Sequence, residues 1–279
     1  MNNTFPQNVI DWLQTLPQAP TFEAMPQNLS PCPILSLTKH LHLHLVSLAA
    51  APYPVALFEQ ISDTFQAKGL QIIHLWEDVW RRQQPLVQAR ILGLLGENNR
   101  IYARLTYTKR IDNEQTNSFL NQYHNQQTTQ ARYKYGLFDK QNHALLAVAT
   151  FTAPRVFRTE PSLYKSSELL RYASLPNITV VGGLSKLIKT FADEVDTQDI
   201  MSYADRDWSV GRSYRQLGFE QEKNVPPQIF WVNPDTFERH AQTHLARSLP
   251  PDTDIITTLQ TQGLVRISNA GSLKFRLLL

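Results

Sequence analysis

The hydrophobic pattern changes from that of a strand to that of a helix between residues 177 and 191. The β-branched run Ile178–Val181 predicts a strand, and the apolar spacing after Leu184 predicts an amphipathic helix. Gly182 and Gly183 lie between the two. Glycines allow a ligand to approach the backbone closely, and a helix start offers free N–H groups and a positive dipole end. The stretch can therefore seat a pyrophosphate, although a glycine pair also simply makes a turn.

The amino-terminal third predicts short elements. Prolines at 6, 17, 20, 26, 31 and 33 exclude long regular structure from residues 1–35, apart from a short helix around 8–16. Leucines alternate with polar residues over 34–48, as in a strand or tight hairpin. The pattern then predicts a helix over 56–68, a strand over 70–76 and a helix over 85–96.

Alternate histidines in the predicted hairpin raise the question of a metal site. His40, His42 and His44 can share one face of a strand. Neighbouring positions on one strand rarely close a tetrahedral site, and no Asp or Glu lies between Ala24 and Phe58. We therefore expect no bound metal.

From residue 100 the order of predicted elements is β-α-β-β-β-α-β-α-β. This order indicates a mixed α/β (α+β) fold with a mixed sheet. The strands are expected over 101–111, 131–138, 144–152, 167–174, 199–204 and 228–232, and the helices over 113–123, after Gly183, and over 211–217. A β-hairpin is expected around the turn 269–272.

Composition limits the protein class. The chain has 279 residues, 42% of them hydrophobic and 18% charged, which is typical of a globular protein. No apolar run reaches the length of a membrane span, and the first 16 residues have no basic start or apolar segment, so we expect no signal peptide. The single cysteine, Cys32, excludes an intramolecular disulfide. We expect a cytoplasmic protein that does not enter a membrane.

Positive charge gathers in the middle of the chain. Between residues 80 and 135 there are nine Lys or Arg and three acidic residues. Such an excess can face phosphates or can be an ordinary solvated surface. Arg266 and Lys274 flank the turn 269–272, which can contact nucleic acid or cover the end of the sheet. The candidate nucleic-acid-binding residues are Arg81, Arg82, Arg104, Arg266 and Lys274.

The order of elements resembles the GNAT acyltransferase fold. GNAT proteins follow their fourth strand with Gln/Arg-x-x-Gly-x-Gly/Ala, and residues 179–184 of this chain match that motif, with Thr179 at the basic or amide position and Leu184 at a small-residue position. They also carry an aromatic-x-x-x-Gly-Phe motif, here Tyr214 to Phe219. The resemblance implies acetyl-CoA or another acyl-CoA as the cofactor.

A longer resemblance covers about residues 57–279. Collinear motifs are similar to phage-encoded homing-endonuclease-like proteins, in which a Vsr-like nuclease precedes a GNAT-like domain. The motifs are Gly69–Trp80, Ile101–Arg104, Phe119–His124, Glu168–Arg171, Val180–Leu187, Ser202–Ser209 and Val265–Phe275.

The resemblance implies a division of the chain. Residues 1–35 would form a proline-rich arm, 36–98 a degenerate nuclease unit of αβα type, 99–235 the GNAT-like domain, and 236–279 an extension with a β-hairpin. A nuclease of this class holds Mg²⁺ with carboxylates. Residues 24–58 contain no acid, so we expect no DNA cleavage.

Site roles follow from the GNAT resemblance. Pyrophosphate would be held by the turn and helix start, with Tyr214 as the general acid. The candidate bases are Glu168, Asp205 and His124. The cofactor-binding residues would be Thr179, Val180, Val181, Gly182, Gly183, Leu184, Ser185 and Lys186.

Each role also has a purely structural alternative. Tyr214 can be a core residue, Asp205 can pair with Arg206, and His124 can interact with the end of its helix. Glu168 and Arg171, three apart on a strand, are expected on opposite faces.

Two functions are therefore open. The first is an acyl-CoA-dependent N-acyltransferase whose acceptor is an amine on a small molecule, a protein or a nucleic acid. The second is an inactive nucleic-acid-binding protein derived from a phage homing endonuclease. A fold by itself does not decide between them.

Overall fold

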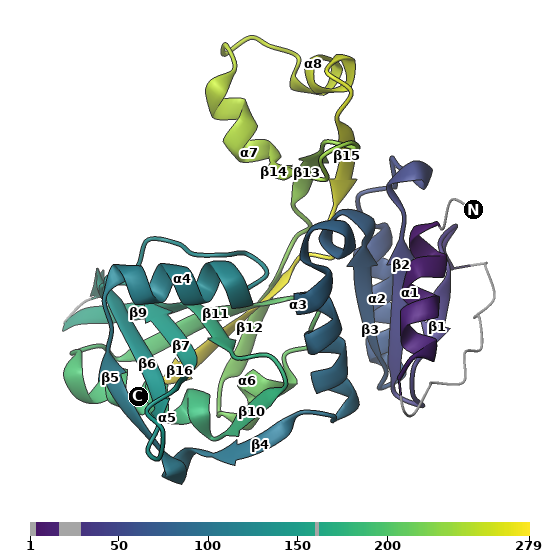
Figure 1. Ribbon diagram of the computed structural model, residues 1–279. Coiled ribbons are helices and arrows are strands. Elements are labelled where there is room, and N and C mark those ends of the chain that lie inside the picture. The colour runs from purple at the N-terminus through teal and green to yellow at the C-terminus, as the bar shows by residue number, and fades with distance from the viewer. Residues whose placement is uncertain (1–3, 17–28, 160–161) are drawn as a thin grey trace. The chain divides into compact units, whose positions relative to one another are not determined.

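The computed structural model describes residues 4–16, 29–159 and 162–279 (Figure 1). The chain forms two compact units. Unit 1 comprises residues 1–82, 204–212 and 223–273, and unit 2 comprises 83–203, 213–222 and 274–279. Each unit thus combines distant parts of the chain, whereas the sequence analysis divides it into consecutive ranges. Among the described residues, no helix has the length and apolar character needed to cross a membrane.

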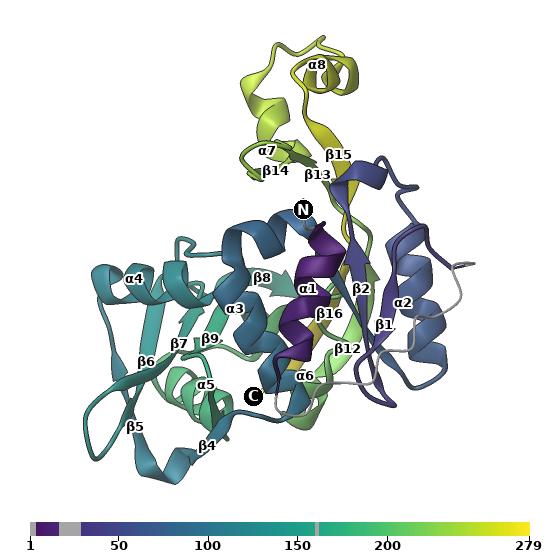
Figure 2. The ribbon, with the colours of Figure 1, turned by 45° about the vertical axis from the view of Figure 1, so that its right-hand side comes forward.

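Unit 1 contains a three-stranded sheet, and Figure 2 shows its strands β1 and β2. Strands β1 and β2 pair antiparallel, with Leu35 opposite Leu43, and β2 pairs parallel with β3. The hairpin, helix and strand predicted here are confirmed, while residues 17–28 of the predicted arm lie outside the described residues. The elements are α1 (Phe5–Gln14), β1 (Ile34–Ser36), β2 (Leu41–Val46), the 3-10 turn η1 (Leu48–Ala50), α2 (Leu57–Ala67) and β3 (Gln71–Trp76).

Strand β2 is the central strand of this sheet, and all of its residues are buried. Its alternate histidines therefore lie in the core. His44 Nε2 lies 2.7 Å from Ser30 Oγ, and His44 Nδ1 lies 2.9 Å from His74 Nδ1. His74 Nε2 in turn lies 2.9 Å from Ser62 Oγ. The polar atoms of the two imidazoles are thus satisfied by one buried hydrogen-bond chain.

The part of unit 1 formed by residues 223–273 contains a second three-stranded sheet, ordered β14-β13-β15. Val232 and Ile267 pack in one cluster with Phe58 and Trp76. The elements are β13 (Ile229–Val232), β14 (Arg239–Ala241), α7 (Gln242–Leu245), the 3-10 turn η3 (Ala246–Ser248), α8 (Ile255–Thr261) and β15 (Val265–Ser268).

Two predictions about this region were wrong. The strand predicted over 228–232 does not join the large sheet, because β13 pairs with β14 and β15. The turn 269–272 does not close a hairpin, because β15 and the following strand, β16, belong to different sheets. The residues of the turn predicted that the chain reverses to form a hairpin. The pairing of β15 and β16 with strands from distant parts of the chain determines the structure instead.

Unit 2 is built on an eight-stranded sheet in the order β12-β16-β11-β9-β7-β6-β5, with β8 paired to β9. The strands are β5 (Thr106–Arg110), β6 (Tyr133–Asp139), β7 (Leu145–Phe151), β8 (Arg155–Thr159), β9 (Ser162–Ser174), β11 (Asp199–Asp205), β12 (Glu220–Val225) and β16 (Ser272–Leu278). Strand β16, the last in the sequence, is inserted between β11 and β12. The large mixed sheet is the fold expected from the sequence. It also contains β8, β12 and β16, which were not among the six strands expected in the order of elements.

Helices cover both faces of this sheet. Phe119 and Leu120 of α4 (Asn113–Tyr123) pack on Val148. Phe191 of α5 (Gly183–Glu194) stacks on Phe151, with ring centroids 4.1 Å apart. Val148 and Phe151 are three apart on β7 and so point to opposite faces. Figure 1 shows α4 and α5 on opposite sides of the sheet.

The segment before β5 differs from the prediction of one strand over 101–111. It forms β4 (Asn99–Tyr102), a 3-10 turn η2 (Ala103–Leu105) and then β5. Strand β4 pairs parallel with β10 (Ile178–Val181) in a separate two-stranded sheet. The helix expected over 85–96 is part of α3 (Glu77–Leu95), which is interrupted at Gln83, two residues before Pro85.

The histidine chain makes unit 1 sensitive to acid. Burial lowers the pKa of His44 to about 3. The unfolded chain therefore binds a proton near pH 6.5 that the folded chain does not, and stability falls as pH decreases from 6.5 towards 3. We expect a slope of about 1.4 kcal/mol per pH unit from this residue. Urea unfolding at pH 7 and pH 5 should show a smaller pH dependence in His44→Gln than in the wild type.

The control for this prediction is His40→Gln, at an exposed position of the same hairpin. It should keep the wild-type pH dependence. An unchanged dependence in His44→Gln would show that the buried imidazole is not its source.

Candidate functional site

The main irregularity of the large sheet lies between β9 and β11. The two strands pair parallel only where Ser166, Ser167 and Glu168 face Asp199, Ile200 and Met201. From Leu169 onward, β9 pairs with β7 on its other side. Beyond Met201 and Glu168 the facing edges of β9 and β11 form no ladder with each other. We call this place the fork.

Tyr214 lies at the fork. It belongs to the short helix α6 (Arg212–Gln216), and its hydroxyl lies 2.9 Å from Ser202 Oγ. Ser202 Oγ donates to the carbonyl oxygen of Leu169 at 3.0 Å. Since a serine has one hydroxyl proton, the Tyr214 hydroxyl donates to Ser202. Ser202 and Leu169 are the first residues past the paired segment, so the three groups bridge the strands where they part.

The ring of Tyr214 is held between two phenylalanines. It stacks on Phe275 at 5.3 Å and meets the edge of Phe219 at 5.2 Å. Burial raises the pKa of Tyr214, and the hydrogen bond to Ser202 opposes that rise. Tyr214 is therefore a protonated hydroxyl in a fixed position. The core and catalytic interpretations are compatible, because the ring packs while the hydroxyl faces the fork.

Glu168 is the last paired residue of β9. A β-bulge follows it, because Thr150 faces Arg171 and Phe151 faces Leu169, which leaves Leu170 without a partner. The extra residue reverses the alternation, so Glu168 and Arg171 lie on the same face. The expectation of opposite faces was wrong for this reason.

The environment of Glu168 favours its neutral form. Burial raises the pKa of its carboxyl group, and the positive charges of Arg155, Arg171 and Lys274 act in the opposite direction. A carboxylate whose pKa lies closer to neutral is a stronger base than an ordinary surface carboxylate.

His124 ends α4 and shares a neighbour with Glu168. Burial, followed by the charges of Arg171 and Arg90, lowers the pKa of His124 to about 3. Its Nδ1 accepts a hydrogen bond from the backbone N–H of Gln126 at 3.1 Å. The imidazole is thus neutral, so the charge–dipole alternative does not apply.

Asp205 belongs to unit 1. One of its carboxylate oxygens accepts the backbone N–H of Asp207 at 3.0 Å, which is a local turn contact. Arg206 forms ion pairs with Glu59 and Asp63. Asp207 is the buried carboxyl group here. Trp76 Nε1 and the Ala270 N–H donate to it, while burial and then Asp205 raise its pKa.

The glycine turn has structural reasons for both glycines. Gly182 has φ +77°, a left-handed conformation that favours glycine. A Cβ on Gly183 would lie 2.9 Å from Val180 Cβ and 3.0 Å from Leu137 Cδ2. Thr179 and Val181 are exposed on β10, whereas Val180 is buried. The turn would therefore be made this way even without a ligand.

The helix start keeps part of its predicted binding capacity. The first hydrogen bond closing α5 runs from the Lys186 N–H to the Gly182 carbonyl. In an α-helix, the N–H groups before this bond, here those of Gly183, Leu184 and Ser185, have no partner within the helix. The Lys186 ammonium donates to the carbonyls of Ala103, at 2.9 Å, and of Thr106. The ammonium group therefore stabilises η2 and is not available as an unpaired charge at the glycine turn.

The basic residues predicted to contact nucleic acid are distributed over both units. In unit 1, Arg81 lies 3.5 Å from Glu77, Arg82 lies 3.8 Å from Glu238, and Arg266 is half-buried. In unit 2, the Arg104 guanidinium lies 5.0 Å from the centre of the Tyr102 ring, and Lys274 lies 2.6 Å from Glu222. The structure does not bring them together in one unit.

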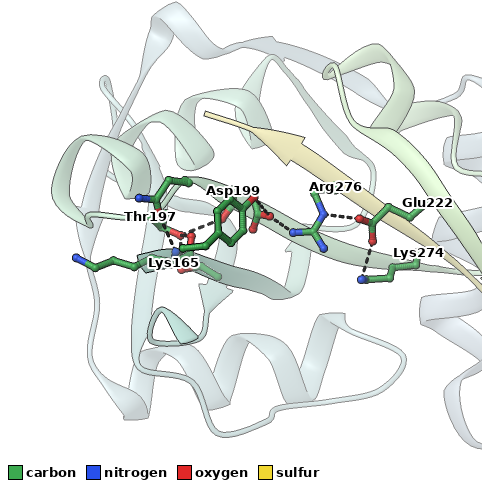
Figure 3. Close-up of polar contacts among 9 residues, drawn as sticks. Lys165, Thr197, Asp199, Glu222, Lys274 and Arg276 are labelled. Atoms are coloured by element: carbon green, nitrogen blue, oxygen red, sulfur yellow. Dashed lines mark hydrogen bonds and ion pairs between the residues drawn. The ribbon is translucent and has the colours of Figure 1, made fainter. Parts of the chain in front are cut away.

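A polar network beside the fork was not predicted (Figure 3). Buried Asp199 accepts from Arg276 and, at 2.5 Å, from the Tyr164 hydroxyl. Arg276 also bonds to Glu222, which in turn pairs with Lys274. Lys274 and Arg276 alternate with the buried Leu273 and Phe275. This alternation over residues 272–278 is typical of a strand and was the signal in the sequence that could have placed the two cations on one face. No local pattern marks Ser202.

Comparison with known proteins returns GNAT-family folds. Neither a family model nor a curated protein sequence matches the chain. Among solved structures, it is similar to an Enterococcus faecalis protein described as a probable N-acyltransferase, with 19% identity over 47% of this chain and 35% of that chain and a TM-score of 0.32. It is also similar to an Elizabethkingia anophelis GNAT family acetyltransferase with acetyl-CoA bound, with 11% identity over 63% of this chain and 99% of that chain and a TM-score of 0.33.

A third similarity is to a Corynebacterium glutamicum structure described as histone acetyltransferase HPA2 and related acetyltransferase. The identity is 15% over 52% of this chain and 62% of that chain, with a TM-score of 0.29. The chain thus spans about a third of the Enterococcus protein and about three-fifths of this one. Because all three TM-scores are below 0.5, these similarities do not decide the function of this chain.

The packing of Gly183 can be tested directly. Gly183→Ala would place a methyl group against Val180 and Leu137, and overpacking of this kind costs about 1–3 kcal/mol. Urea unfolding should show the loss. Ser185→Ala, at an exposed position in the first turn of the same helix, should change stability by less than about 0.5 kcal/mol. Equal stability of both variants would contradict close packing at Gly183.

Proposed function

We propose that the protein is an N-acyltransferase that uses acetyl-CoA or another acyl-CoA. The observations that carry this proposal are the Tyr214 hydroxyl held at the fork and Glu168, the last residue of β9 in the ladder that ends there. Acyl transfer from a thioester to an amine needs a proton donor for the departing sulfur and a base for the amine. Tyr214 and Glu168 have the chemistry of such a pair.

The fork provides a place for an extended ligand. Two parallel strand edges without a mutual ladder offer backbone N–H and C=O groups to a molecule inserted between them. The cofactor contains amide groups that can use such partners, and when bound it supplies the activated acyl group. The α5 start, with the N–H groups of Gly183, Leu184 and Ser185, would hold its phosphates. Lys186 is not assigned to phosphate binding, because its ammonium group donates to carbonyl groups of Ala103 and Thr106.

Each residue at the fork has a separate proposed role in proton transfer. Tyr214 holds a proton at its hydroxyl, and the two phenylalanine rings fix the direction of that hydroxyl. Ser202 keeps the hydroxyl in place and can turn its own proton towards the tyrosine oxygen when that oxygen becomes negative. Glu168 accepts a proton from the incoming amine. His124, with its low pKa, and Asp205, in unit 1, are weaker candidates for the base.

Binding of the cofactor can be measured by thermal stability. A ligand at a hundred times its dissociation constant stabilises the folded state by about 2.7 kcal/mol. We therefore expect acetyl-CoA to raise the melting temperature of the full chain in a concentration-dependent way. No rise at millimolar acetyl-CoA would refute the proposed function.

The role of Tyr214 can be separated from binding. Tyr214→Phe should keep the acetyl-CoA-dependent rise in melting temperature but release thiol from acetyl-CoA about 10²-fold more slowly. Spermidine, a lysine peptide and a single-stranded oligonucleotide serve as amine sources. Tyr107→Phe is the control, because its hydroxyl contacts His143 at the surface. Unchanged thiol release in Tyr214→Phe would make Tyr214 a core residue only.

Glu168 should determine the acid limb of the pH profile. A base must be deprotonated, so turnover falls as pH decreases through the pKa of Glu168, which burial raises from its ordinary value. Glu168→Gln should slow thiol release about 10²-fold and remove this limb. Glu220, an exposed residue of β12, provides the control, and Glu220→Gln should keep the limb. If the acid limb of the pH profile persists in Glu168→Gln, a group other than Glu168 causes it and the proposed base is wrong.

A further inference from the structure

One face of the sheet around the fork is defined by strand register. Met201 pairs with Glu168, and neighbouring residues of paired strands point to the same side. Arg155 pairs with Ser166 and Phe157 with Tyr164, at alternate positions along β9 that share the side of Glu168. Tyr203 follows Met201 by two residues. We call this side, bearing Arg155, Phe157, Glu168, Arg171 and Tyr203, the Glu168 face.

The Glu168 face is open over β11 and β8. Tyr203 is 42% exposed and Phe157 is 48% exposed. On the other side of β11, Ile200, Ser202 and Ala204 are buried. That side of β11 is therefore covered, with Tyr214 of α6 in contact with Ser202, while the aromatic side chains of Tyr203 and Phe157 are exposed on the Glu168 face.

The Glu168 face carries unbalanced positive charge. Lys274 and Arg276 are balanced by Glu222 and Asp199 (Figure 3). Arg155 is exposed, and among the described residues it forms no hydrogen bond or ion pair. Arg171 donates only to the carbonyl oxygens of Gln127 and Leu170. Neutral carbonyls do not cancel its charge. Among the described residues that define the Glu168 face, Arg155 and Arg171 therefore leave an excess of positive charge over Glu168.

The exposed rings add a second kind of chemistry. Phe157 and Tyr203 form no ring–ring contact within the described part of the chain. Cations that meet phosphates, interspersed with free aromatic faces, are the features by which proteins bind single-stranded nucleic acids. An acidic peptide would satisfy the arginines but leave the rings unused. A duplex would present phosphates, but its bases are already stacked on each other.

We propose that a single-stranded nucleic acid binds along the Glu168 face. Arg155 and Arg171 contact its phosphates, and Phe157 and Tyr203 stack on its bases. An amine of this strand is then the acceptor at Glu168, a step that rests on the proposed acyltransferase function. The basic residues Arg81, Arg82, Arg104 and Arg266 play no part in this surface.

Fluorescence anisotropy with a labelled single-stranded oligodeoxythymidine tests the proposal on the full chain. Affinity should fall steeply between 50 and 200 mM salt, as phosphate contacts require. Arg155→Ala should weaken binding and reduce the slope of log K against log salt by about 0.7, the value for one phosphate on a single strand. Tyr203→Ala should weaken binding about tenfold, whereas Tyr203→Phe should bind as the wild type does.

Arg158→Ala is the matched control. It removes the same charge from the same exposed strand, but its side chain points to the opposite face from Arg155. The proposal predicts wild-type binding for Arg158→Ala. Equal losses in Arg155→Ala and Arg158→Ala would overturn it, because they would indicate diffuse charge attraction.

Two competitors decide the class of ligand. The proposal predicts that unlabelled single-stranded DNA displaces the probe more effectively than a duplex of the same length or polyglutamate. Equal displacement by polyglutamate would indicate an acidic peptide, and stronger displacement by duplex would indicate double-stranded DNA. Either result overturns the proposal.

The acetyl-CoA melting shift, measured on the same samples, keeps this inference separate from the proposed function. A cofactor shift without oligonucleotide binding would refute the nucleic-acid surface alone. Oligonucleotide binding without a cofactor shift would support the surface and refute acyl transfer.

Discussion

The short parallel pairing of β9 with β11 is the constraint on which the candidate site depends. Three residues of each strand form the ladder, and then the strands take different neighbours. A continued ladder would have consumed the backbone groups that now line the fork and would have left no room for the bridge from Tyr214 through Ser202 to Leu169. The bulge at Leu170 belongs to the same departure and directs Glu168 and Arg171 to one face.

Two networks of this protein pair buried polar groups with one another. In unit 1, two serines and two histidines form a continuous hydrogen-bond chain. In unit 2, Asp199 is fully buried and is held by Arg276 and Tyr164. Burying such groups without partners would cost several kcal/mol each. One of the alternating histidines, His44, therefore belongs to a core hydrogen-bond network.

The glycine turn illustrates how one motif can have two explanations. Its left-handed residue and its close contact with Val180 are enough to require Gly182 and Gly183. The motif alone is consequently weak support for a cofactor. The fork, which no local motif reveals, is the stronger reason to propose acyl transfer, because it combines an open strand edge with a positioned hydroxyl and a partly buried carboxyl group.

Local periodicity determined the elements of this protein that depend on near neighbours in the chain. The helices α2, α4 and α5, the strands β6 and β7, and the turn at Gly182 were predictable because side-chain period and backbone conformation are local properties. Tertiary structure decided the insertion of β16 between β11 and β12, the partner of β15, and the orientation of Glu168. These features depend on pairing between segments that are distant in the sequence. A shift of one residue in register turns each side chain of a strand to the other face, and no local pattern determines that register.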